Sequence, residues 1–231
     1  MKRFLIVLSI IILPLSIFGQ SVPVSKILFP YPYNCEIKTQ TPIQTKFLSK
    51  YSFGETVSDE ILCKKNNVKY WKLAPHFKSY TDGNTERFLA NSFFTFGGIE
   101  WSELYLYTVN SKIFDLTFIT LGDVESFNIL KDMFTKKYGN PNVIKDNIST
   151  IINEKKKNSG SLETTVIDKE IESILCWEDN NHRQIVLRSH VDKKESISRT
   201  LNLVTSEGCI IQLNYIDKSI SKNIKVGIDE I

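Results

Sequence analysis

Alternating apolar and polar positions predict a β-hairpin near the middle of the chain. Residues 101–109 and 113–120 are two β-rich runs, separated by the short polar segment 110–112. A three-residue loop places Leu106 opposite Leu116, whereas a two-residue loop would pair apolar with polar positions and mix the two faces. We therefore expect a three-residue loop between the two strands.

An amphipathic helix is predicted directly after this hairpin. Asp123 is a suitable N-cap, and Gly139 followed by Pro141 ends the pattern. Apolar side chains recur between them at a spacing of three to four residues: Val124, Phe127, Leu130, Phe134 and Tyr138. We expect a helix over residues 123–138 whose apolar stripe packs on the sheet.

Strands and turns are expected after the helix. Residues 143–152 predict a strand, and residues 153–161, which contain three consecutive lysines, predict a solvated loop. A second, short helix is expected earlier in the chain, over residues 58–65. Two further hairpins are expected, with residues 171–178 paired with 182–191 and residues 200–205 paired with 209–216.

These elements indicate an α+β fold, in which one or two helices pack on one face of an antiparallel sheet of β-hairpins. The hydrophobic content of 42% is sufficient for a substantial core. Residues 20–231 form either a single domain or two small, similar subdomains with a boundary near residues 90–98.

The N-terminus has the three-part layout of a secretory signal peptide over residues 1–19. Lys2 and Arg3 are positively charged, residues 4–13 are mostly apolar, and small residues approach the expected cut. The apolar run is well short of the roughly 20 residues that a membrane-spanning helix needs. We expect export to the periplasm or the extracellular space without a membrane span, and without a lipid anchor because no cysteine lies at the cut.

Cleavage of the signal peptide also removes Lys2 and Arg3. Of the 29 basic residues, 27 then remain against 26 acidic residues, which gives a formal net charge of +1. A nearly neutral chain lacks the electrostatic signature of proteins that bind nucleic acids or anionic membranes. We therefore expect no nucleic-acid partner.

The cysteines and histidines indicate structural roles. Cys35, Cys63, Cys176 and Cys209 allow three disulfide pairings in an oxidising compartment. No two of them are close in sequence, and none has a histidine at a metal-ligand spacing. The Gly-x-Ser-x-Gly motif of many hydrolases is also missing. We predict structural cysteines, whose pairing stays open, and no catalytic residue, cofactor or metal site.

The best candidate for a binding site is one face of the central hairpin. One set of residues is expected to face the helix: Leu104, Leu106, Phe114, Leu116 and Phe118. Alternation directs a second set to the opposite face: Trp101, Glu103, Tyr105, Tyr107, Asp115 and Thr117. An exposed aromatic platform edged with acidic groups could bind a sugar, a peptide or a partner protein. Alternatively, these aromatic residues are simply favourable in strands, or a loop or second layer covers them.

The order of the elements also resembles a known layout. The resemblance rests on Phe-Gly-Glu-Thr-Val-Ser at 53–58, the central hairpin, Lys-Tyr-Gly-Asn-Pro at 137–141, Trp177, and Ile-Gln-Leu-Asn-Tyr-Ile-Asp at 211–217. The chain is similar to uncharacterised exported proteins of Bacteroidetes-type bacteria, whose layout resembles the β-lactamase-inhibitor-protein-like fold. The resemblance covers about two thirds of the mature chain. It implies helices on one face of an antiparallel sheet, and a binding or envelope role rather than known chemistry.

Two classes of function follow from the sequence. The first is an exported, non-enzymatic binding module for an unknown protein, peptide or glycan. The alternative is a secreted or periplasmic hydrolase that acts on a glycan or peptide. A deep pocket with convergent histidine or carboxylate groups would favour the hydrolase, and a flat aromatic sheet face would favour the binding module.

Overall fold

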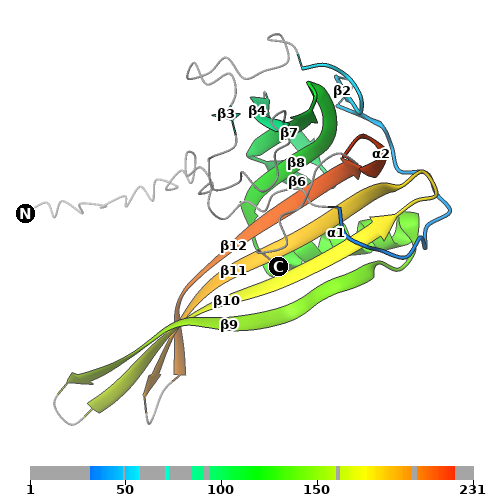
Figure 1. The fold of residues 1–231 in the computed structure, drawn as a ribbon. Helices are drawn as coiled ribbons and strands as arrows, with labels where there is room; N and C mark the ends of the chain where they lie inside the picture. Colours follow the sequence, from blue (N-terminus) through cyan, green and yellow to red (C-terminus); the bar gives the residue numbers. More distant parts are fainter. Residues whose placement is uncertain are drawn as a thin grey trace, which may run out of the picture.

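The computed structural model describes seven stretches of the chain: residues 32–48, 50–57, 71–72, 85–90, 94–159, 162–198 and 202–221. Its main feature is one eight-stranded antiparallel sheet (Figure 1). The strands, in spatial order, are β3 (Trp71–Lys72), β4 (Thr85–Ala90), β7 (Glu103–Val109), β8 (Lys112–Gly122), β12 (Asn202–Asp217), β11 (Arg183–Ser198), β10 (Leu162–Glu178) and β9 (Asn142–Ser159). The predicted signal peptide, the predicted helix over residues 58–65, and Cys63 lie outside the described residues.

Smaller elements accompany this sheet. Two short hairpins form separate two-stranded sheets, and two helices complete the described elements: β1 (Lys46–Phe47) with β2 (Tyr51–Ser52), β5 (Phe94–Phe96) with β6 (Ile99–Trp101), α1 (Val124–Tyr138) and α2 (Lys218–Ser221). The expected antiparallel sheet is confirmed, but strands so outweigh the two helices that the described fold is sheet-dominated. Strands β4 and β7, on either side of residues 90–98, pair with each other within the large sheet.

The predicted helix is confirmed as α1. Asp123 is its N-cap, and the Oδ1 atom of this residue accepts a hydrogen bond of 2.7 Å from the backbone N–H of Ser126. Gly139 ends the helix at φ 85°, a left-handed conformation that glycine adopts without steric cost. Val124 was expected in the apolar stripe but is 47% exposed. The buried stripe therefore begins one turn later, with Phe127, Leu130, Phe134 and Tyr138.

The central hairpin has the expected register but a shorter turn. Leu106 pairs with Leu116, as predicted. The turn has only two residues, Asn110 and Ser111, with φ angles of 49° and 64° that are typical of a type I′ turn. A β-bulge at Phe114 then shifts the register and compensates for the shorter turn. The expected three-residue loop is therefore wrong, and Phe114 lies in the core on the face opposite α1.

The last four strands are longer than the sequence predicts. The hairpin between residues 171–178 and 182–191 is confirmed as β10 and β11. The expected loop over residues 153–161 is wrong, because β9 continues through the lysine run to Ser159. The expected hairpin within residues 200–216 is also wrong, because β12 is continuous and pairs with β11 along its length. These backbone hydrogen bonds override the local turn signal.

The large sheet has buried side chains on both faces. On one face, apolar residues of α1 and of the central strands form one core cluster, which includes Leu106, Leu116 and Leu213. On the other face, a second apolar cluster includes Tyr107 and Val186. Strands β9 to β12 extend beyond α1, and β9 forms the outer edge of the sheet (Figure 1). Among the described residues, no helix has the length and apolar character to span a membrane.

Candidate functional site

Several charged side chains meet where β10 turns into β11. The Asp-Asn-Asn segment at 179–181 favours a tight turn, because a short Asx side chain can hydrogen-bond to the backbone two residues ahead. Asp179 does so: its Oδ1 atom accepts from the backbone N–H of Asn181 at 2.9 Å and of Arg183 at 3.0 Å. The turn ends at His182, whose φ of 58° is in the left-handed region. The turn thus holds His182 next to the end of β10.

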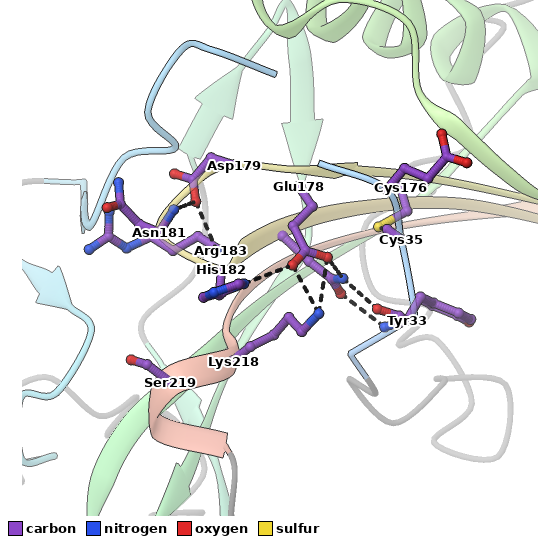
Figure 2. Close-up of polar contacts among 12 residues, drawn as sticks. Tyr33, Cys35, Cys176, Glu178, Asp179, Asn181, His182, Arg183, Lys218 and Ser219 are labelled. Atoms are coloured by element: carbon purple, nitrogen blue, oxygen red, sulfur yellow. Dashed lines mark hydrogen bonds and ion pairs between the residues drawn. The ribbon is translucent and has the colours of Figure 1, made fainter. Parts of the chain in front are cut away.

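Glu178 is the centre of this group (Figure 2). Its side chain is only 2% exposed and accepts three hydrogen bonds. Lys218, at the start of α2, donates to both carboxylate oxygens at 2.9 and 3.0 Å, and Gln184 donates at 2.6 Å. The Nδ1 atom of His182 lies 3.4 Å from the same carboxylate. A buried carboxylate requires a counter-charge, and the Lys218 ammonium supplies it. We call these four residues the Glu178 cluster.

The Glu178 cluster also fixes the first described segment of the chain. The Oε1 atom of Gln184 accepts from the backbone N–H of Tyr33 at 2.9 Å, and its Nε2 atom donates to the Tyr33 carbonyl at 2.6 Å. Two residues later, the sulfur atom of Cys35 lies against that of Cys176 in β10, at 2.6 Å (Figure 2). The cluster therefore joins three regions that are far apart in sequence.

The pair of His182 and Glu178 has one feature of a catalytic dyad. The imidazole side chain is 57% exposed, and its Nδ1 atom points to a buried carboxylate, as in sites where a carboxylate orients a general base. Among the described residues, however, no serine, threonine or cysteine side chain hydrogen-bonds to His182. The arrangement as it stands stabilises the turn and positions the imidazole at the surface.

A second group, formed by Glu170, His190 and Asp192, has ligand atoms within 4.8 Å of one another. Arg188 lies beside it, with Nη2 at 3.2 Å from the Nδ1 atom of His190. A guanidinium can only donate, so Nδ1 accepts and Nε2 carries the proton, which faces Asp192 at 3.2 Å. A cation bound at Nε2 would displace that proton and leave an imidazolate. The geometry therefore fits a hydrogen-bond network better than a metal site.

The expected aromatic platform is not exposed. Trp101 is fully buried on the sheet face that α1 covers. It packs edge-on against Phe118, with ring centres 5.9 Å apart. It lies there because the strand is interrupted at Ser102, so the alternation of β7 does not extend to β6. Tyr105 and Tyr107 are buried on the opposite face. The burial of these three rings agrees with the alternative hypothesis, in which they are covered residues of the strands.

Polar partners surround the buried tyrosines. The hydroxyl of Tyr105 donates to Glu103 at 2.7 Å, and the guanidinium of Arg87 lies 5.1 Å from the centre of the Tyr105 ring. Burial raises the pKa of Tyr107 to about 12, so this phenol stays neutral near pH 7. Glu103, Tyr105 and Tyr107 are thus brought together as predicted, but both tyrosines are buried and Glu103 is half-buried.

Asp115 lies in the same buried layer, within a chain of side-chain hydrogen bonds. Thr117 donates to its Oδ1 atom, and the Nδ2 atom of Asn214 lies 3.3 Å from Oδ2. Gln212 donates to Asn214 at 2.9 Å. Burial raises the pKa of Asp115 well above its usual value, although the hydrogen bonds from Thr117 and Asn214 act in the opposite direction.

Asp115→Asn should therefore change how stability depends on pH. The folded-state pKa of Asp115 is raised, so its contribution to stability is complete below the unfolded pKa of 3.8 and is lost as the pH rises above it. The wild-type protein should lose more stability than Asp115→Asn between about pH 4 and pH 7. Urea unfolding at both pH values measures this difference. Asp146→Asn, at an exposed carboxylate, is the control, and equal pH dependence in wild type and Asp115→Asn would contradict the interpretation.

Exposed apolar side chains gather on the edge strand β9. Four large aliphatic residues there are each more than half exposed, with values from 53% to 59%: Val143, Ile148, Ile151 and Ile152. We call them the β9 row. Sequence analysis predicts a strand in this region but not its exposure. One sequence signal could have indicated this exposure. The apolar residues of this segment do not alternate with period two, as they would on a half-buried strand.

The backbone of β9 is poorly suited to pairing with another strand. Its register against β10 shifts at three places, and Asn147 has a φ of 49°. Bulges and edge lysines are the devices by which natural sheets avoid adding further strands. Lys155 and Lys156 lie exposed in the same strand. A partner at this edge would therefore contact side chains rather than extend the sheet.

Sequence reasoning missed the Glu178 cluster because Lys218, at the start of α2, lies 40 positions from Glu178 in the sequence. Only the Asp-Asn-Asn turn signal pointed to this region. Comparison of the sequence with models of known protein families and with curated proteins gives no match. The resemblance to exported proteins of Bacteroidetes-type bacteria stays a prediction, and the function has to be inferred from the geometry of the chain.

Proposed function

We propose that the protein is an exported, non-enzymatic binding module whose partner contacts the β9 row. The observation that carries this proposal is the exposure of four large aliphatic side chains within residues 143–152. Single exposed apolar residues are common on protein surfaces, whereas larger apolar patches mark interaction sites, and these four side chains lie within ten residues of one edge strand. Burying such a side chain against a partner contributes about 1.5–3 kcal/mol when the burial is complete.

The chemistry of this surface favours a protein as the partner. The large hydrophobic side chains that are exposed among the described residues are all aliphatic. A sugar is usually bound by stacking on an exposed aromatic ring, and the predicted aromatic platform is buried. Lys155 and Lys156 continue the strand beyond the β9 row and add positive charge. We therefore propose a protein partner with an apolar surface bordered by acidic side chains.

Export is part of this proposal and rests on the predicted signal peptide over residues 1–19. The predicted destination is the periplasm or the extracellular space. The resemblance to exported proteins with a β-lactamase-inhibitor-protein-like layout supports the same role, because it implies binding rather than catalysis.

The hydrolase alternative is favoured by one observation, the pair of His182 and Glu178. This pair supplies an oriented imidazole. A hydrolase also needs a nucleophile or a bound water at that imidazole. The β9 row requires no additional group in order to bind a partner, so the binding function is the better supported of the two.

A photo-crosslinking residue at position 151 tests the proposal in the cells that export the protein. It should give a discrete adduct between the exported chain and one protein. Ile129 is the matched control position, because it is also an isoleucine, is 49% exposed, and lies on α1. The same adduct pattern at positions 151 and 129, or no adduct at position 151, would contradict the proposal.

A further inference from the structure

The N-terminal segment around Cys35 is fixed against the sheet on both sides of the cysteine. Before it, the backbone of Tyr33 makes two hydrogen bonds with Gln184. After it, Glu36 exchanges hydrogen bonds with the side chain of Asn142, at 3.3 Å and 3.0 Å. The backbone N–H of Thr39 donates to the Glu178 carbonyl at 3.5 Å. These contacts hold Cys35 at one place on β10.

That place is occupied by Cys176. The two sulfur atoms are in contact, at 2.6 Å, although the residues are 141 positions apart in the sequence (Figure 2). Both residues belong to the apolar cluster on the face opposite α1, in which Cys176 is fully buried and Cys35 is partly buried. A disulfide requires sulfur atoms that approach each other directly, and this geometry supplies that approach.

Cys209 lies on the other face of the sheet. It belongs to the core cluster that contains α1, whereas Cys176 belongs to the opposite cluster. The sheet therefore separates Cys209 from both Cys35 and Cys176. Two of the three pairings of the four cysteines join Cys35 to Cys209 or to Cys63, and neither is compatible with the contact at Cys176.

We propose that Cys35 and Cys176 form a disulfide bond that ties the N-terminal segment to the sheet. The inference goes beyond the binding function and does not depend on the β9 row. The bond would hold Tyr33 against Gln184, and would thereby keep the Glu178 cluster covered at one end. It would also close a long loop, which restricts the unfolded chain and favours the folded one.

The bond forms by thiol–disulfide exchange with a small or protein disulfide as oxidant. Cys35 is the partly exposed member, and its hydrogen bond with Cys176 lowers its pKa, whereas that bond together with burial raises the pKa of Cys176. The Cys35 thiolate attacks the oxidant to give a mixed disulfide and one released thiol. Cys176 then loses its proton and attacks the Cys35 sulfur, which releases the second thiol. The two cysteines lose two protons and two electrons, and the oxidant gains them.

The test uses the purified chain, reduced under native conditions and then treated with oxidised glutathione. After free thiols are blocked, tryptic digestion should give residues 27–38 joined to residues 170–183, a species that reductant separates. Cys209→Ser should keep the joined peptide, whereas Cys35→Ser and Cys176→Ser should each abolish it. Because the oxidant is added to purified protein, a failure of export in cells does not affect this result.

Two results would overturn the proposal. One is that residues 27–38 and 170–183 are recovered separately, with both cysteines blocked as free thiols or carrying glutathione. The other is that either peptide is joined to one containing Cys63 or Cys209. A urea unfolding transition of the reduced chain, recorded on the same sample before the oxidant is added, distinguishes these outcomes from a misfolded sample.

Discussion

Phe134→Ala is expected to lower the free energy of unfolding by about 3–5 kcal/mol. The ring is 2% exposed and lies at the centre of the interface between α1 and the sheet. Its ring centre lies 5.5 Å from that of Trp177 and 6.4 Å from that of Tyr215, and it stacks on Tyr138 with ring centres 6.2 Å apart. Truncation removes these contacts and leaves a cavity that rings held by three elements cannot easily fill.

Urea unfolding of wild type and variant gives this difference directly. Lys136→Ala is the control, because it lies on the same helix two residues away but is exposed, and it should change stability by less than about 0.5 kcal/mol. If both variants lost similar amounts of stability, α1 would not be anchored through Phe134.

Lys218→Met is expected to destabilise the fold by about 2–3 kcal/mol. The change keeps much of the apolar stem but leaves the carboxylate of Glu178, which is 2% exposed, without its counter-charge. The expected loss lies below the roughly 3–5 kcal/mol that is typical for a broken buried pair, because the Lys218 side chain is itself 25% exposed. The backbone N–H of Lys218, which donates to the His182 carbonyl, is unchanged.

A double-mutant cycle separates the charge effect from packing. In a Glu178→Gln background, Lys218→Met should cost much less, because no carboxylate is then left unpaired. Lys38→Met is a control for an exposed pair, since Lys38 and Glu36 form an ion pair at the surface and its loss should cost less than about 1 kcal/mol. If Lys218→Met lowered the free energy of unfolding equally in the wild-type and the Glu178→Gln backgrounds, the ion pair would not be what stabilises the turn.

The elements that sequence analysis predicts correctly are those fixed by local interactions. The helix α1 depends on its cap at Asp123, its terminating Gly139 and its apolar spacing, all of which are readable along the chain. The turn between β10 and β11 is similarly local, because the side chain of Asp179 bonds to backbone groups within four residues. Such features need no knowledge of distant partners.

The elements that it predicts wrongly depend on interactions between distant segments. A three-residue loop without a bulge and a two-residue turn with a bulge at Phe114 both place Leu106 opposite Leu116. The pairing of these two residues therefore does not distinguish the two arrangements. The turn signal near Gly208 is outweighed by pairing with β11, whose partner for Gly208 is Asp192. The lysine run at 155–157 is compatible with an edge strand as well as with a loop, so polarity alone does not distinguish them.

The candidate sites divide in the same way. Alternation correctly groups Tyr105, Tyr107 and Asp115 on one face, but it carries no information about what covers that face. The contact between Cys35 and Cys176 joins residues 141 positions apart, so the sequence leaves three pairings open. The Glu178 cluster likewise forms only when Lys218 of α2 meets the β10–β11 hairpin.

The most direct test of the binding proposal compares affinity with stability in the same variants. Ile151→Ser should weaken binding of the crosslinked partner at least about tenfold, which is about 1.4 kcal/mol, while its unfolding midpoint in urea stays close to that of wild type. Ile129→Ser should leave both unchanged, because that side chain is exposed but lies on α1 and not on β9. Unchanged affinity in Ile151→Ser, or an equal loss of affinity in both variants, would contradict the assignment of the β9 row as the binding surface.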